Sequence, residues 1–200
     1  MIIVDHLSIN GPGKADIAAR RRLVTVCEHW RCAVEAMTFR FIWDKCKTDE
    51  DVKLLCSTIE RRGRVSHLRD LVVDLRQVAA IDCVAAIRKI LTLLSRLDEY
   101  KEYGSHPGVG LKLYMSGKYG REGVHSQLEA IERALLPPFP QVNAIRALKV
   151  NVVSNPSTLG IANRLVESAP CAMHPTFKFY KMPQEVWHGK HFPFLNFVVH

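Results

Sequence analysis

The chain has 200 residues, of which 48% are hydrophobic and 24% are charged. This balance is typical of a folded globular protein and excludes a disordered one. The 28 Lys and Arg residues outnumber the 20 Asp and Glu residues, which gives a net charge of +8. A basic surface of this kind favours an acidic partner, although solubility alone would also explain it.

The cysteines and the apolar runs indicate a compartment. The six cysteines contain no C-x-x-C pair, and most fall inside helical patterns, so we expect small buried thiols in a reducing environment. Asp5 and His6 stand too early for the apolar region of a signal peptide, and no window approaches eighteen apolar residues. The expected location is the cytoplasm or the nucleus, with no membrane partner.

The first predicted helix is amphipathic. Apolar residues recur at steps of one, three and four, which places them on one stripe of a helix. They are Leu23, Val26, Cys27, Trp30, Val34 and Met37. Such a stripe must pack against something, and the simplest interpretation is a core-facing helix anchored by Trp30.

The second helix has a clear start and stop. Thr48 is an expected cap, acidic residues fill the first turn, and Asp51 completes an approximate capping box. Arg61-Arg62-Gly63 gives cations and then glycine at the end of this helix.

Strands and helices are then predicted to alternate. In chain order they are a strand at 68–75, a helix from Asp82 to about Tyr103, a strand at 111–115, a helix at 126–136, a strand at 147–153, a helix at 157–169, a strand at 177–181 and a final uncertain segment at 192–199. Strand starts lie roughly 30 to 40 residues apart, the length of one strand-helix unit. A strand that leads into a helix indicates a parallel crossover, so the predicted fold class is α/β.

The order of residue types near the N-terminus resembles the second half of an F-box. In that family a short apolar helix precedes a helix with a Val-Cys-x-x-Trp-Arg pattern, and a Trp follows about a dozen residues later. Here these are residues 26–31 and Trp43, and residues 34–39 look like the version found in fungal F-box-like proteins. The Leu-Pro-x-Glu opening of the family is missing, so the F-box is incomplete.

The resemblance implies two regions and a function. Residues 1–45 would be an incomplete F-box-like helical segment, and residues 46–200 an irregular strand-helix array of leucine-rich-repeat-like character that binds the substrate. The protein would catalyse nothing and would recruit a protein substrate to a cullin-RING ubiquitin ligase through a Skp-family adaptor. The positions that match the family's adaptor-binding or core pattern are Leu7, Leu23, Val26, Cys27, Trp30 and Trp43.

A set of polar residues aligns when the strands are placed in register at Leu71, Leu111, Leu148 and Phe177. The face opposite the apolar residues would then carry a ladder of lysines with two tyrosines. We hypothesise that this face binds an acidic protein partner through Lys112, Tyr114, Lys149, Asn151, Lys178 and Tyr180. The alternative is a solvated face on which the lysines only aid solubility.

Two other functions stay open at this stage. The loop Gly117 to Gly123 lies between a strand and a helix, so Lys118 and Arg121 could bind phosphate in a small α/β phosphate- or nucleotide-binding enzyme. Its spacing matches no established phosphate-loop pattern, which favours a plain surface loop. The third possibility is a basic interaction protein that no longer binds the ligase adaptor.

Nucleic acid, metal and cofactor are not expected. The arginine runs at 20–22 and 61–64 lie at helix ends without interleaved aromatics, which disfavours nucleic-acid binding. His188 and His191 are three residues apart, but Gly189 and Pro193 argue against the helix that would let them share a metal ion.

Overall fold

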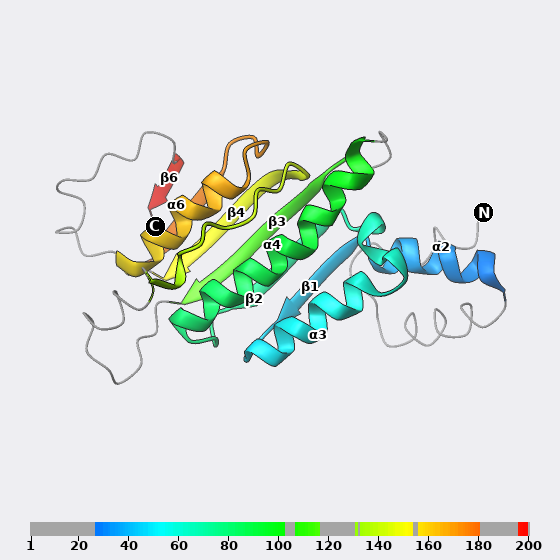
Figure 1. Ribbon diagram of the computed structural model, residues 1–200, viewed down its shortest axis with the longest axis horizontal. Helices are drawn as coiled ribbons and strands as arrows, with labels where there is room; N and C mark the ends of the chain where they lie inside the picture. Colours follow the sequence, from blue (N-terminus) through cyan, green and yellow to red (C-terminus); the bar gives the residue numbers. More distant parts are fainter. Residues whose placement is uncertain are drawn as a thin grey trace.

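The computed structural model describes residues 27–102, 107–116, 131, 133–153, 156–180 and 196–199. These residues form an α/β fold around a parallel sheet (Figure 1). The strands are β1 (Phe41–Lys45), β2 (Asp70–Leu75), β3 (Val109–Ser116), β4 (Ile145–Val153), β5 (Thr176–Tyr180) and β6 (Asn196–Val199). The helices are α2 (Glu28–Thr38), α3 (Asp49–Glu60), the 3₁₀ helix η1 (Arg61–His67), α4 (Ala80–Glu102) and α6 (Pro156–Ser168). The predicted α/β class and the parallel pairing are confirmed.

The strands lie in the sheet in the same order as in the chain, β1-β2-β3-β4-β5-β6. Parallel crossovers are right-handed, so a series that always steps in one direction brings its helices to the same face. Figure 1 shows α3 and α4 passing in front of the strands on one face. The described chain therefore forms two layers, a sheet and a helix layer.

The hydrophobic core lies between these layers. Alternate strand residues point toward the helices, and their side chains are buried: Leu71, Val73, Leu75, Leu111, Leu113, Met115, Leu148, Val150, Val152 and Phe177. Helices α3, α4 and α6 contribute the matching apolar stripes, including Ile59, Leu94 and Leu165. This alternation was predicted for β2 and holds for β3 and β4.

Helix α3 begins as its sequence predicts. The Thr48 hydroxyl accepts a hydrogen bond from the Asp51 backbone N–H at 3.2 Å, and the Asp51 carboxylate accepts one from the Thr48 N–H at 3.0 Å. The capping box is therefore confirmed. Helix α4 begins at Ala80, so Asp82 lies in its first turn and is not the cap.

The N-terminal segment differs from the prediction. Helix α2 begins at Glu28, Cys27 is its exposed N-cap, Trp30 is half-buried and Val34 is buried. Leu7, Leu23 and Val26 lie outside the described residues. The prediction that residues 41–45 belong to a helical segment is wrong, because they form β1 and pair with β2. Aromatic and β-branched residues at 41–43 favour an extended strand, and pairing with Asp70–Asp74 fixes it.

Within the described ranges, no helix combines the length and apolar character needed to cross a membrane.

A core substitution on α4 should be costly. Leu94 is fully buried beneath the sheet, so Leu94→Ala is expected to lower the free energy of unfolding by about 2 to 5 kcal/mol. The matched control is Leu54→Ala on α3, because Leu54 is 68% exposed and should change stability by roughly 0.5 kcal/mol or less. Urea denaturation followed by circular dichroism measures both. Equal losses in the two variants would contradict the described packing.

Candidate binding groove on the open sheet face

The sheet face opposite the helix layer is lined by rows of side chains that run across the strands. Residues on this face stand directly beside one another because the pairing is parallel and in register. The first row is Phe41, Asp70, Gly110 and Ala147. The second row is Trp43, Val72, Lys112, Lys149 and Thr176. The third row is Lys45, Asp74, Tyr114, Asn151 and Lys178.

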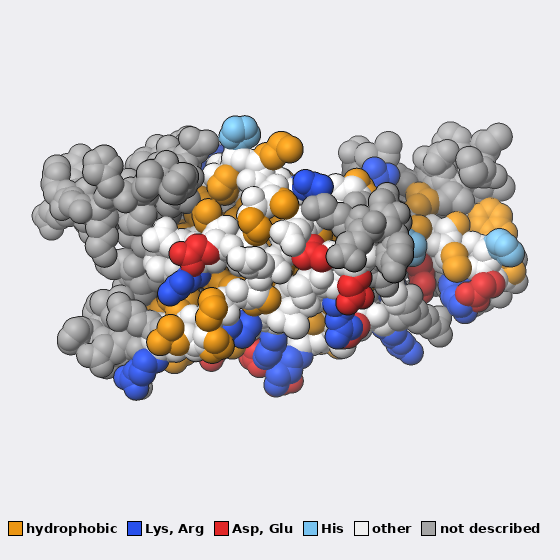
Figure 2. All heavy atoms as spheres, turned by 45° about the horizontal axis from the view of Figure 1, so that its top comes forward, with side chains coloured by type: hydrophobic (Ala, Val, Ile, Leu, Met, Phe, Trp, Pro, Cys, Tyr) orange, Lys and Arg blue, Asp and Glu red, His pale blue; other side chains and the backbone are white. Residues whose placement is uncertain are grey.

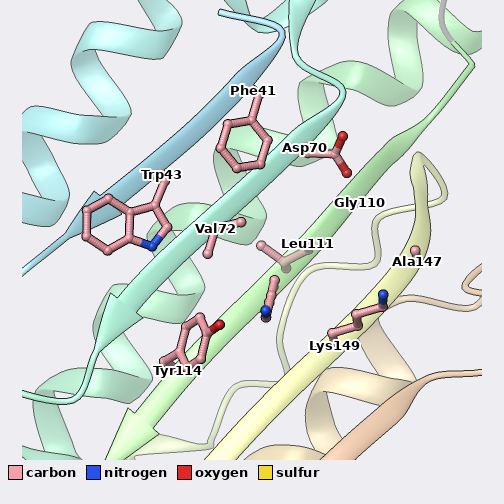
Figure 3. Close-up of a pocket in the computed structure, with 10 residues that line it drawn as sticks. Phe41, Trp43, Asp70, Val72, Gly110, Leu111, Tyr114, Ala147 and Lys149 are labelled. Carbon is pink, nitrogen blue, oxygen red and sulfur yellow. The ribbon is translucent and has the colours of Figure 1, made fainter. Parts of the chain in front are cut away.

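The residues of the first two rows from β1 to β4, with Leu111 and Tyr114, line a groove of about 340 Å³ (Figure 3). Figure 3 shows these side chains in front of the sheet, with helix ribbons behind it. The groove is hollow because Gly110 has no side chain and Ala147 has only a methyl group, while larger residues surround them. The hollow is therefore a consequence of two small residues on neighbouring strands.

One wall of the groove is aromatic. Phe41 and Trp43 on β1 are each 59% exposed, although large apolar side chains normally contribute to cores. Val72 lies beside Trp43 on β2 and does not belong to the core between sheet and helices. An exposed apolar patch next to a hollow is typical of a binding surface.

The other wall is basic. Lys112 and Lys149 stand side by side on β3 and β4. Within the described part of the chain, neither ammonium group has a carboxylate within ion-pair distance. The Lys112 ammonium group lies 4.8 Å from the centroid of the Tyr114 ring. Like charges directly opposite each other are unfavourable, so a bound anion would stabilise this pair.

The helix layer contains cations that have carboxylate partners. Two of its cations form ion pairs between helices: Lys89 contacts Asp49 and Arg96 contacts Glu60. Figure 2, which views the molecule from another direction, shows acidic and basic side chains adjoining in several places. Lys112 and Lys149 thus differ from these paired cations of the helix layer.

The third row contains an ion pair between the buried Asp74 and the half-exposed Arg76. Asp74 is 2% exposed and accepts hydrogen bonds from the Arg76 guanidinium at 2.9 and 2.7 Å. These bonds hold the pKa of Asp74 below its ordinary value of 3.8. The Arg76 guanidinium also lies 5.4 Å from the Tyr114 ring centroid, so the Tyr114 ring is close to two cations.

Gly110 leaves room for a carboxylate. A Cβ atom at this position would lie 2.5 Å from Asp70 Oδ1, closer than real contacts allow. Asp70 therefore projects beside the hollow and places a negative charge at its aromatic end.

The predicted lysine ladder is only partly right. The aligned register of Leu71, Leu111 and Leu148 is confirmed, but Phe177 pairs with Val150. Lys149 is consequently beside Thr176, and Lys178 is beside Asn151 in the third row. A slip of two residues keeps every side chain on its face, so alternation alone could not distinguish the registers.

The other predicted partner-binding residues divide between the rows. Tyr114 and the buried Asn151 stand side by side in the third row, as predicted. Tyr180 pairs with Val153 at the end of β5, and its side chain lies outside the described ones.

Sequence reasoning missed the aromatic wall. It placed Trp43 in an adaptor-binding helical segment, whereas the structure places it in the groove. The signal that could have found it is the alternation of Phe41 and Trp43, which puts both on one face of a strand.

The remaining candidates do not form a second site among the described residues. The loop 117–123 and both histidines at 188 and 191 lie outside them. No group of three described His, Cys, Asp or Glu residues is arranged to hold a metal ion. Burial raises the pKa of the Cys46 and Cys83 thiols to about 12, so both are protonated at neutral pH and are poor nucleophiles.

A scan against protein-family models, a search of curated proteins and a search of solved structures each found no match to this chain.

The Asp74–Arg76 pair predicts a specific acid sensitivity. Because the pKa of Asp74 is lower in the folded chain, the pair stabilises the fold above the ordinary Asp pKa, and this stabilisation is lost as pH falls through the folded pKa. Asp74→Asn should therefore be less stable than wild type at about pH 6, and the gap should shrink toward about pH 2 to 3.

Urea denaturation at both pH values measures this gap. Glu99→Gln on the exposed side of α4 is the control, and its stability should match that of wild type at either pH. A gap for Asp74→Asn that is the same at both pH values would show that the ion pair is not responsible.

Proposed function

We propose that this protein is a non-catalytic binding protein that holds an acidic segment of a partner protein in the groove on the open sheet face. The observation that carries the proposal is the adjacent pair Lys112 and Lys149, which has no carboxylate partner in the described chain and adjoins exposed aromatics. Apolar anchors beside complementary charges are the usual composition of a protein-binding surface.

The second part of the proposal concerns the partner's fate. The F-box resemblance supports a role in which the N-terminal segment binds a Skp-family adaptor and the bound partner becomes the substrate of a cullin-RING ubiquitin ligase. The sequential strand order supports the leucine-rich-repeat-like interpretation, because such arrays also carry their helices on one face and their partner on the other. Trp30 on α2 is the described residue best suited to test adaptor binding, since Trp43 lines the groove.

Charge reversal in the groove should abolish binding of an acidic peptide. We expect a fluorescein-labelled oligo-glutamate peptide to bind the wild-type chain with an affinity that falls as salt rises. Lys112→Glu/Lys149→Glu should weaken this binding about tenfold or more, because two favourable charge contacts become repulsive. Fluorescence anisotropy measures the affinity, and thermal melts verify that each variant is folded.

The matched control for net charge is Lys47→Glu/Arg61→Glu. Both residues are exposed, and neither lines the groove. The control should bind the peptide within about twofold of wild type, since only the general field of the protein changes. Equal weakening in the two double variants would rule out the groove as the site.

The ligase role predicts direct capture of the adaptor. Purified wild-type chain and a Lys112→Glu variant should both be retained by an immobilised Skp-family adaptor. The Trp30→Ala variant should fold but should not be retained. No capture of the wild-type chain would reject the ligase role and leave the groove as part of a basic interaction protein. Loss of capture with Lys112→Glu as well would show a shared surface instead of two separate ones.

A further inference from the structure

We infer that the groove recognises two features of its partner at a fixed spacing: one apolar side chain over β1 and β2, and an acidic pair over β3 and β4. The partner segment is extended and lies across the strands. This inference rests on the proposed function, since it specifies what kind of acidic segment the groove accepts.

The apolar end is defined by three side chains. Phe41 and Trp43 project from alternate positions of β1, and Val72 is the neighbour of Trp43 on β2 (Figure 3). An aliphatic or aromatic side chain placed here would cover surface that both aromatics now expose to water.

The acidic end is defined by Lys112 and Lys149. They occupy the same row as Trp43 and Val72, so the whole site is one line perpendicular to the strands. Two carboxylates that alternate along an extended peptide are about 7 Å apart, which suits two flexible lysines on adjacent strands.

The strand spacing sets the distance between the two ends. Neighbouring strands are about 4.8 Å apart, so the line from the middle of β1 and β2 to Lys149 on β4 spans about 12 Å. An extended peptide advances about 3.3 Å per residue and alternates its side chains between two faces, so the apolar residue and the far acidic residue are separated by about four positions, an even number that turns both toward the sheet.

Asp70 gives the site its direction and its preference for peptide. Its carboxylate lies beside the hollow next to Phe41, so it repels an acidic group from the aromatic end. It would equally repel the regularly charged backbone of a nucleic acid, whereas the N–H groups of a peptide can donate hydrogen bonds to a carboxylate. The combination favours an isolated acidic cluster on a polypeptide.

The test uses short labelled peptides of Gly and Ser that carry a Glu-x-Glu unit. One series adds a single Leu at varied distances before or after this unit, and the reference peptide has no Leu. Wild-type affinity should be about tenfold higher than for the reference when Leu and the far Glu are about four residues apart, and should decline at other spacings.

Two variants separate the ends of the site. Trp43→Ser should remove the advantage of the Leu peptides while the salt-dependent affinity for the reference peptide stays within about twofold. Leu54→Ser is the control for loss of an exposed apolar residue, since Leu54 is 68% exposed on α3 and does not line the groove, and it should keep the Leu advantage.

Three results would overturn the inference. Affinity that does not depend on Leu or its spacing would show simple charge attraction, and the proposed function would survive. If an oligothymidylate displaced every peptide at a concentration below that of the peptide, and if Lys112→Glu/Lys149→Glu no longer bound the oligothymidylate, the groove would be assigned to nucleic acid. Absence of binding by the oligo-glutamate peptide itself would reject the proposed function and this inference together.

Discussion

The right-handedness of parallel crossovers is the constraint on which the rest of this structure depends. Each strand of the sheet lies beside its successor in the chain, so every step goes in the same direction. With one hand of crossover, helices α3, α4 and α6 must then cover one face. Doubly wound sheets reverse direction and cover both faces, but no reversal occurs among the described strands. The open face is thus a product of strand order.

A strand with one open face alternates apolar and polar residues along its length. Parallel strands buried on both faces are almost continuously apolar, whereas β3 alternates Leu111, Lys112, Leu113 and Tyr114. The face of the sheet opposite the helices carries paired and unpaired charges in different rows. Asp74 forms an ion pair with Arg76. Lys112 and Lys149 have no carboxylate partner in the described part of the chain, so they are available to a ligand. This division between a stabilised row and a row available for binding supports the groove as the functional surface.

An ion pair joins helix α2 to the 3₁₀ helix η1. Arg64 of η1 forms an ion pair with Glu35 of α2 at 2.8 Å and lies 4.5 Å from the ring of Phe39. Both side chains of the pair are largely shielded from solvent. Helix α2, which carries Trp30, is therefore held against the element that precedes β2. Under the proposed ligase role, this contact would fix the adaptor-binding helix relative to the groove.

The sequence by itself determined the local features and the fold class. The capping box at Thr48 and Asp51 and the alternation in β2 depend on residues within a few positions of one another, so a linear pattern is enough to predict them. Only the tertiary structure decided features that join distant segments. The register of β5 differs by two residues from the predicted one, and residues 41–45 form a strand because they pair with β2. Arg88 donates hydrogen bonds to three carbonyls that lie 46 to 50 residues away in the chain. The tertiary structure also brought Trp43 beside Lys112 and Lys149, because strands distant in the chain become neighbours only when the sheet forms.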